Sequence, residues 1–224
     1  MGILVGVAIG SGLMDLFALV RGWTRARYVW KPFTMVVIIA LAFLGADWGN
    51  AWHQWLLAGL VLSLVGDVFL VLPSDRFLAG LVSFFAAHVC YIVAFVDQGA
   101  SDTPGIVHFS VEIGERSGHA TSVAVALGAI GVVAVAVLRR GVLASGGLGL
   151  LVAVVCYITV ILAMIWRAAL SNDAWVFAGA ALFLISDAVL AWNRFIKSSL
   201  AAELTVMVTY YTAQLFLAFS LLTT

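Results

Sequence analysis

The chain has 224 residues, of which 64% are hydrophobic and 10% are charged. Soluble domains are about half apolar and about a quarter charged, so this composition excludes an ordinary soluble domain and predicts an integral membrane protein. The formal net charge is zero, so no overall basic surface is available for nucleic acid. We expect an all-α fold in which residues 1–224 form a single transmembrane domain.

Eight apolar runs in the sequence are long enough to cross a bilayer, which takes about 20 mainly apolar residues. The first run lacks the basic start and the small-residue cleavage site of a signal peptide, so it counts as a span. Pro32 is expected to open the second span, because the first turn of a helix does not need the missing N–H. The predicted transmembrane helices are 3–20, 32–46, 55–72, 77–96, 120–138, 148–166, 174–192 and 205–222.

The connections between these spans differ in charge. The longest one, 97–119, is polar and contains Gly and Pro, so we expect a loop there, with room for a short interfacial helix near 109–116. Nine of the eleven Lys and Arg residues lie on the side of the membrane that holds the connections after the odd-numbered spans. The positive-inside rule makes that side cytoplasmic, with both termini outside the cytoplasm, as for a bacterial inner membrane protein. These nine residues are Arg21, Arg25, Arg27, Lys31, Arg76, Arg139, Arg140, Arg194 and Lys197.

One apolar segment resembles another further along the chain. The stretch AGLVLSLVGDVFL (58–70) aligns without gaps with AGAALFLISDAVL (178–190). The alignment pairs Asp67 with Asp187, each of which is an acidic residue inside a predicted span.

The spans that follow these segments also align. FFAAHV (84–89) matches YYTAQL (210–215), which pairs His88 with Gln214. The partners are four spans apart and so run in the same direction, as in parallel repeats. The repeat predicts two four-helix halves related by a pseudo-twofold axis along the membrane normal.

The two repeated aspartates are expected at matching depth. Each lies about five residues before the end of its predicted span, which is about 8 Å below the cytoplasmic boundary. Ionisable residues in hydrocarbon are costly and usually functional. We therefore predict that Asp67 and Asp187 are functional groups in one pocket that opens toward the cytoplasmic leaflet. Other polar residues expected to line this pocket and bind substrate are Lys31, His88, Asn193, Arg194, Tyr210, Tyr211 and Gln214.

The same residues also have structural interpretations. The two aspartates can be buried carboxylates that pair with Lys31 or Arg194. His88 is as compatible with a hydrogen-bonded structural role as with a catalytic one. Asp15, near the end of the first span, is either a third acid of the site or an end-of-helix residue.

Several motifs resemble the lysoplasmalogenase (YhhN-like) membrane family. The most specific are LVGDVFL around Asp67 and GAALFLISDAVLAWNRF (179–195), supported by FLAGLVSFFAAHVCYI, KPFTM and TYYTAQLFLA. The resemblance covers nearly the whole chain. Ala87 departs from the family pattern, where glycine is expected, and the long connection 97–119 is particular to this chain.

The resemblance implies hydrolysis of the vinyl ether bond of lysoplasmalogens to a fatty aldehyde and glycerophosphoethanolamine or glycerophosphocholine. Protonation of the outer alkene carbon gives an oxocarbenium-like ion that water attacks, and glycosidases meet a related ion with two carboxyl groups. One protonated and one charged aspartate suit this task, and the sequence leaves open which of them gives the proton. Lys31, Arg194 and the basic segment 21–27 are the expected partners of the lipid phosphate.

Three other functions remain compatible with the sequence. A small proton-coupled transporter can use the same carboxylates, although they lie near one face rather than at the midplane. A metal-dependent hydrolase could use Asp67, Asp187 and His88, but no HExxH motif or Cys/His cluster is present, and we expect no metal and no other cofactor. The third alternative is a scaffold with structural acids. The expected partners are a lysophospholipid substrate and membrane lipids, and the oligomeric state stays open.

Overall fold

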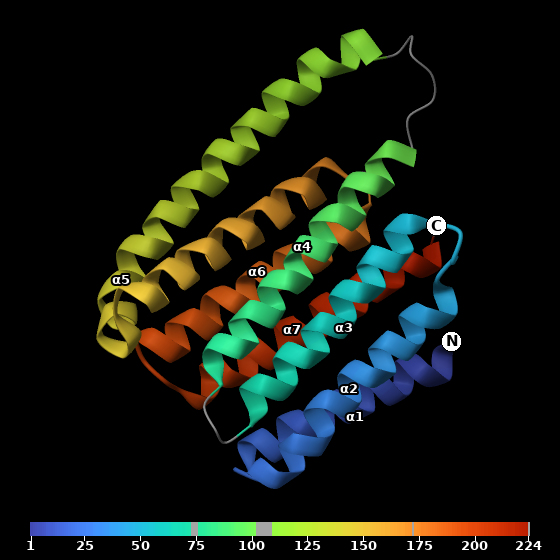
Figure 1. Ribbon diagram of the computed structural model, residues 1–224. Coiled ribbons are helices and arrows are strands. Elements are labelled where there is room, and N and C mark those ends of the chain that lie inside the picture. The colour runs from blue at the N-terminus through green and yellow to red at the C-terminus, as the bar shows by residue number, and fades with distance from the viewer. Residues whose placement is uncertain (73–75, 102–108, 172, 224) are drawn as a thin grey trace.

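Seven helices make up the described part of the chain, and they run between the same two ends of the molecule (Figure 1). The structure is a computed structural model that describes residues 1–72, 76–101, 109–171 and 173–223, with side chains described except at 99–101 and 109–119. These residues contain no strand, which confirms the all-α class, and all seven helices are long and apolar enough to cross a membrane. The helices are α1 (Gly2–Val20), α2 (Thr24–Gly45), α3 (Ala51–Val71), α4 (Phe77–Ser101), α5 (Phe109–Leu170), α6 (Ala174–Phe195) and α7 (Leu200–Thr223).

Helix α5 folds back on itself at a pair of glycines. If straight, its 62 residues would extend about 93 Å, roughly three times the thickness of a hydrocarbon core. Gly146 (φ −161°, ψ 16°) and Gly147 (φ 66°, ψ −159°) leave the helical conformation, and the positive φ of Gly147 suits a residue without a side chain. The two arms then run back along each other (Figure 1), and Trp166 Nε1–H donates a 3.0 Å hydrogen bond to the Ala120 carbonyl across them.

This bend accounts for the difference from the predicted number of helices. The predicted spans 120–138 and 148–166 lie on the two arms of α5, which is one element with a bend between them. Eight separate helices are therefore not confirmed, and the described part of the chain has seven.

Helix α2 begins at Thr24 rather than near residue 32, so Pro32 does not open the helix as predicted but lies inside it. Proline removes one backbone N–H from a helix interior. Transmembrane helices tolerate this because nearby hydroxyls and neighbouring helices satisfy the freed carbonyl groups. In the next turn the Thr34 hydroxyl donates to the Trp30 carbonyl at 2.9 Å. The early start places Lys31 within the helix, where its side chain is buried in the bundle.

The predicted loop 97–119 is shorter in the structure than in the sequence-based expectation. Helix α4 continues to Ser101 and α5 starts at Phe109, so the short helix considered near 109–116 is the beginning of α5 and not a separate element. Residues 102–108 lie outside the described residues. Polar residues such as Glu, Arg and Gln are good helix formers, so a helix can continue past the apolar span.

Two helix pairs form the centre of the bundle, α3 with α4 and α6 with α7. In each pair a glycine of the predicted repeat permits close approach. A Cβ atom on Gly59 would lie 2.3 Å from Cε1 of Tyr91, and one on Gly179 would lie 2.9 Å from Cγ of Leu217. Small residues matter here because lipid chains are as apolar as the helices, so association depends on close packing. The two repeated glycines thus have the same packing role, while the pseudo-twofold relation between two halves stays a prediction.

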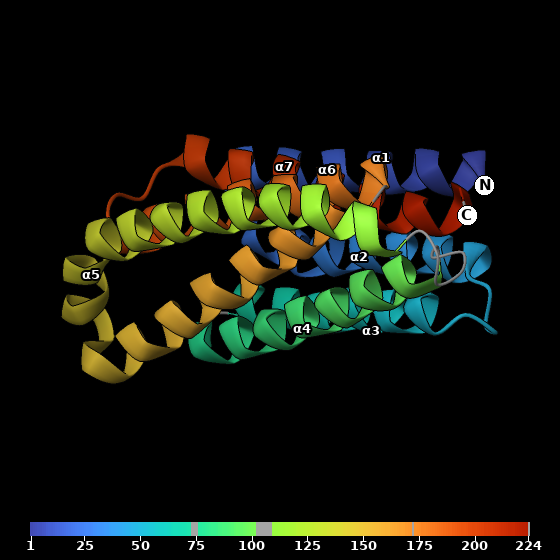
Figure 2. The same ribbon diagram turned by 90° about the horizontal axis from the view of Figure 1, so that it is seen from above.

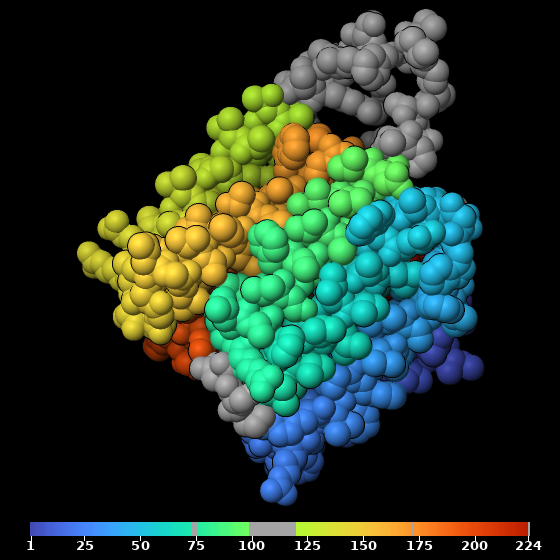
Figure 3. All heavy atoms as spheres, viewed as in Figure 1, coloured from blue at the N-terminus to red at the C-terminus, as the bar shows by residue number. Residues whose placement is uncertain are grey.

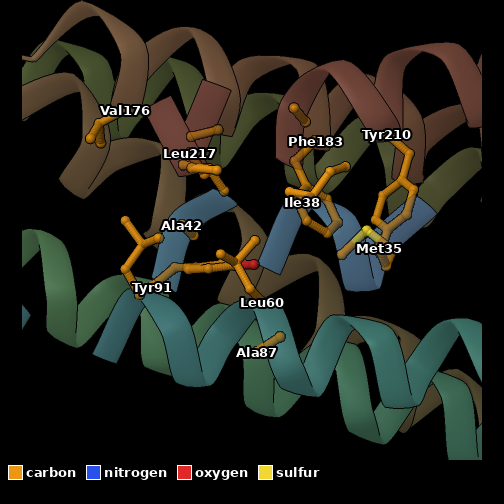
Figure 4. Close-up of a cluster of buried hydrophobic side chains, with 14 of the residues drawn as sticks. Met35, Ile38, Ala42, Leu60, Ala87, Tyr91, Val176, Phe183, Tyr210 and Leu217 are labelled. Atoms are coloured by element: carbon orange, nitrogen blue, oxygen red, sulfur yellow. The ribbon is translucent and has the colours of Figure 1, made fainter. Parts of the chain in front are cut away.

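Apolar side chains from α2, α3, α4, α6 and α7 fill the middle of the bundle (Figure 4). Ile38, Leu60, Phe183 and Leu217 are fully buried there. Helix α1 packs against α2 and α7, and α5 packs against α4 and α6, so α1 and α5 lie on opposite sides of this centre (Figures 1 and 3).

The two ends of the bundle differ in charge, as the distribution of Lys and Arg predicted. Both chain termini lie at one end (Figures 1 and 2). The opposite end holds the α1–α2 turn, the start of α4, the bend of α5 and the α6–α7 turn. We call this second end the basic end, because the residues Arg25, Arg76, Arg140 and Lys197 belong to these segments.

Candidate active site

A cavity of about 500 Å³ lies between α2, α3, α6 and α7 at the basic end. We call it the polar cavity. Both predicted catalytic residues, Asp67 and Asp187, line it, as the repeat led us to expect. Its lining also includes Arg27, from the basic segment expected to meet the phosphate, and Arg76, which was not assigned to the site. Four of the seven predicted binding residues line it, namely Lys31, Asn193, Arg194 and Tyr210.

Asp67 is buried in an ion pair. Its residue is 1% exposed, and Oδ1 lies 3.0 Å from Nζ of Lys31 in α2. The Tyr210 hydroxyl of α7 donates to Oδ2 at 2.6 Å. Both carboxylate oxygens therefore have a partner, and the nearby ammonium favours the charged form of the carboxyl group. The pairing of Asp67 with Lys31 was one of the structural alternatives in the sequence.

Asp187 has a different environment. The Tyr157 hydroxyl of α5 donates to its Oδ2 atom, and Nε2 of His88 lies 3.9 Å from the same oxygen. Nδ1–H of His88 donates to the Phe84 carbonyl at 2.5 Å, which fixes the tautomer of a neutral ring and leaves Nε2 as the acceptor. Nε2 is buried and makes no hydrogen bond to the described residues. A proton on the Asp187 carboxyl group would therefore face the acceptor atom Nε2 of His88, whereas the Asp67 carboxylate faces the Lys31 ammonium group.

Asp15 is a third buried carboxylate beside this site. Nε of Arg27 lies 3.4 Å from its Oδ1, and the Tyr211 hydroxyl donates to Oδ2 at 2.9 Å. Arg27 itself lines the polar cavity. Asp15 thus holds a cavity-lining arginine from outside the lining, and its role as a third acid of the site stays a prediction.

Three predicted binding residues lie behind the cavity rather than in its lining. Nε2 of His88 lies close to the Asp187 carboxylate, and the Tyr211 hydroxyl donates a hydrogen bond to Asp15. Gln214 is fully buried, and its Oε1 accepts a 3.0 Å hydrogen bond from the Tyr91 hydroxyl. Their side chains are thus placed to hold the site or the core, not to touch a ligand in the cavity.

The two cavity-lining residues at the end of α6 also make contacts within the fold. The Asn193 carboxamide oxygen accepts from the Ser199 N–H at 2.8 Å and so holds the α6–α7 turn. The Arg194 guanidinium lies 4.9 Å from the centre of the Phe77 ring. Arg194 therefore places its charge in the lining of the polar cavity, within cation–π distance of an aromatic ring.

Tyr157 is the main residue of this site that sequence reasoning missed. It lies on the second arm of α5, in the apolar run VAVVCYITVILAM. A tyrosine in the middle of a span, far from the interfaces where aromatic residues gather, needs a partner for its hydroxyl. That unusual position was the available signal. The partner could not be found from the sequence, because the repeat gave no match for the spans that form α5.

A second cavity, of about 290 Å³, adjoins the first between α4, α5 and α6. We call it the apolar cavity, since Asp187 is the only charged residue in its lining. Asp187 lines both cavities, so its carboxyl group lies where a polar space meets an apolar one. The other residues shared by the two linings are Leu70, Phe77, Phe84 and Leu190.

Metal binding finds no support among the described side chains. Their His, Cys, Asp and Glu residues form no group of three or more that could hold a metal ion. Cys90 and Cys156 are free cysteines on different helices.

A comparison with known protein families matches residues 26–221 to the YhhN family. The chain belongs to the YhhN family. The match extends from α2 to α7 and includes both aspartates of the polar cavity. The resemblance noted in the sequence motifs is therefore confirmed.

Individual relatives of this YhhN-family chain carry more specific names. It is 31% identical to Lysoplasmalogenase TMEM86B of Mus musculus over 204 residues, which cover 89% of this chain and 76% of the relative. It is 27% identical to Lysoplasmalogenase of Mycobacterium bovis, over 81% of this chain and 65% of the relative. It is 35% identical to Uncharacterized membrane protein YhhN of Shigella flexneri over 88 residues, or 39% of this chain and 42% of the relative. No solved structure matches the chain.

Proposed function

We propose that this YhhN-family protein hydrolyses the vinyl ether bond of lysoplasmalogens in a membrane. The relatives named lysoplasmalogenase support this function. The observation that carries it is the location of Asp187, where the polar and apolar cavities meet. A lysoplasmalogen has the same division, because its vinyl ether joins a polar glycerophosphate headgroup to an alkenyl chain.

The two aspartates have complementary roles in this proposal. Protonated Asp187 gives its proton to the outer alkene carbon, so the carboxyl O–H bond breaks and a C–H bond forms. The product is an oxocarbenium-like ion, comparable to the one in glycoside hydrolysis. Asp67, kept as a carboxylate by Lys31, stabilises the positive charge. Water attacks the ion and gives a proton back to Asp187, and the hemiacetal then collapses to an aldehyde and an alcohol.

The assignment of the acid rests on the different partners of the two carboxyls. Asp67 has an ammonium group at 3.0 Å, which favours its charged form. Asp187 has a tyrosine hydroxyl and the acceptor atom of an imidazole beside it. His88 is a positioning residue in this scheme, because its Nε2 can hold the carboxyl proton of Asp187 between turnovers. The sequence had left the choice between the two acids open.

The cations of the polar cavity suit the phosphate of the headgroup. Arg76 and Arg194 line the cavity at its open end, and Lys31 and Arg27 lie deeper. Guanidinium groups bind phosphate oxygens through two parallel hydrogen bonds, which holds the headgroup in one orientation. In this arrangement the phosphate contacts Arg76 and Arg194, while Lys31 remains committed to Asp67.

The packed centre of the bundle favours this function over the transporter. A transporter needs a path from Asp67 to the opposite end of the molecule. The space below the cavity is occupied by buried side chains of Met35, Leu60, Phe183 and Leu217 (Figure 4). The cavity thus has one polar mouth, at the basic end, as a hydrolase of a membrane lipid requires.

The test of the proposed function is a measurement of aldehyde release by the purified protein in detergent or lipid vesicles. We expect aldehyde from a 1-alkenyl lysophospholipid and none from the matching 1-alkyl ether, which lacks the double bond that is protonated. Proton flux across vesicles without aldehyde release would favour the transporter instead. Aldehyde formation that a chelator abolishes would favour a metal-dependent hydrolase.

Replacement of Tyr157 by phenylalanine is expected to lower aldehyde release by about 10- to 100-fold, because Asp187 becomes charged as its proton leaves and a hydrogen bond to a charged group contributes about 1.5–3 kcal/mol. The fall should appear in kcat rather than in KM. Tyr157 contacts the proton donor Asp187, whereas phenylalanine keeps an aromatic ring beside the alkenyl chain of the substrate. The matched control is Tyr28→Phe, at an exposed tyrosine of α2. Equal activity of the two variants would remove Tyr157 from the proposed site.

We also infer that the basic end faces the cytoplasm, with both termini on the other side. Positive charge marks the cytoplasmic side of membrane proteins. In a variant without Cys90 and Cys156, a cysteine in place of Arg25 is expected to react with an impermeant maleimide in inverted vesicles and not in intact cells. A cysteine in place of Gly49, at the opposite end, should give the reverse result. Labelling of the Arg25 position in intact cells would reverse the orientation.

A further inference from the structure

The two arms of α5 enclose a groove of about 660 Å³ that the proposed chemistry does not use. We call it the hairpin groove. Among the described residues its lining is apolar apart from Arg139 toward the basic end, Thr159 in the middle of the second arm, and the indole N–H of Trp166 toward the other end. Val132, one of its lining residues, is 71% exposed, so the groove opens at the surface of α5 that faces lipid in a membrane. Helix α5 forms an edge of the molecule in the space-filling view (Figure 3).

The hairpin groove adjoins the apolar cavity. Both linings contain Gly131 of the first arm and Ile158 and Leu162 of the second arm. The apolar cavity in turn shares Asp187 with the polar cavity. The three spaces therefore adjoin one another along a path from the basic end, past Asp187, to the lipid-facing surface of α5.

We propose that this path holds the alkenyl chain of the substrate, and that the contact of Gly131 with Leu162 sets which chain lengths are accepted. This inference rests on the proposed function, because it assumes that the vinyl ether lies at Asp187. It adds a chain-binding subsite and a residue that determines specificity for chain length.

The dimensions of the apolar cavity support this subsite. On the first arm its lining runs from Leu138 to Ile130, and eight residues of helix rise about 12 Å. A lipid chain in one leaflet extends about 15 Å, half of the hydrocarbon core. A long alkenyl chain is therefore longer than the apolar cavity and continues past Gly131 into the hairpin groove. An alkenyl chain of about half the length of a leaflet's hydrocarbon layer ends before Gly131.

Gly131 allows the two arms of α5 to approach closely at this junction, so a side chain there would meet its neighbours. A Cβ atom there would lie 2.8 Å from Cδ1 of Leu162 and 3.8 Å from Cγ2 of Ile158. Cδ1 is the free end of a flexible side chain, so Leu162 can turn aside and the hairpin can still close. In turning aside, Leu162 would enter the junction together with the new side chain.

The test compares chain-length profiles of Gly131→Leu and of the wild type, using 1-alkenyl lysophosphatidylethanolamines with a long chain and a short chain. We expect kcat/KM for the long chain to fall at least about tenfold relative to the short chain, a usual scale of discrimination in a hydrophobic pocket. Retained turnover of the short chain shows that the variant folds. Ala129→Leu is the matched control, because Ala129 is exposed on the same arm and lines none of the three spaces.

A second variant acts in the opposite direction. Leu162→Ala should widen the junction and raise the ratio of long-chain to short-chain turnover. Unchanged profiles in both variants, with aldehyde still released, would overturn the chain subsite and leave the proposed function intact. Absence of aldehyde from the wild type would instead reject the proposed function.

A binding readout keeps the subsite testable without catalysis. A non-cleavable 1-alkyl lysophospholipid with a photoreactive group at the chain end is expected to label α5 in the wild type. The label should move away from α5 in Gly131→Leu. Equal labelling of α5 in both proteins would show that surrounding lipid, and not the substrate chain, fills the groove.

Discussion

Replacement of Asp187 by asparagine is expected to lower aldehyde release by about 10²- to 10⁴-fold, the usual contribution of a proton donor in the transition state. Asparagine has nearly the same shape and keeps an oxygen that can accept from Tyr157, so the fold should tolerate the change. It cannot give a proton to the alkene carbon. The loss should therefore appear in kcat under saturating substrate.

The control for this variant is Asp47→Asn, the same chemical change at an exposed aspartate near the opposite end of the bundle. Its activity should stay within about twofold of the wild type, as expected for a surface change far from the site. If Asp187→Asn keeps comparable activity while Asp67→Asn does not, the roles of the two acids are exchanged. If both keep it, the two-carboxylate mechanism is wrong.

Replacement of Lys31 by methionine is expected to lower the free energy of unfolding by about 3–5 kcal/mol, because it leaves a buried charge without its partner. The Lys31 side chain is 8% exposed and that of Asp67 is 2% exposed, so the pair is almost completely buried and the lost charge is poorly compensated. Methionine keeps the length of the apolar stem. The measurement is equilibrium unfolding in mixed micelles, with Lys197→Met as the control at an exposed lysine.

The double variant Lys31→Met with Asp67→Asn separates stability from catalysis. Removal of both charges should restore most of the lost free energy, since a buried ion pair can often be replaced at little cost. Aldehyde release should stay low, because the charge opposite the oxocarbenium-like ion is missing. A double variant as unstable as Lys31→Met alone would show that the lysine acts through packing and not through its charge.

Much of the site could be predicted because the chain repeats itself. The aligned segments gave Asp67 and Asp187 a common depth and direction, and the structure brings both to one cavity. Lys31 was also among the expected partners of Asp67. These inferences needed only the composition of the spans and the regular geometry of a helix.

Other features depended on contacts between helices that the sequence does not repeat. The spans of α5 match no other part of the chain, so Tyr157 had no predicted partner. Helix α2 starts before Pro32, because a bundle can satisfy the carbonyl that proline leaves free, and local propensity does not include this. The break in α5 at Gly146 and Gly147 does lie between the predicted spans 120–138 and 148–166, but the sequence did not show that helix continues through residues 139–145 up to it.

Tyr210 and Tyr211 are neighbours in the chain, yet their hydroxyls reach carboxylates on two different helices, Asp67 of α3 and Asp15 of α1. Successive side chains on a helix diverge by about 100° and rise by about 1.5 Å, so one rotational setting of α7 satisfies both bonds. The two hydrogen bonds from α7 therefore fix the positions of α1 and α3 relative to each other along the bundle axis. A shift of α7 by one residue would therefore break both hydrogen bonds together and leave Asp67 and Asp15 without their tyrosine partners.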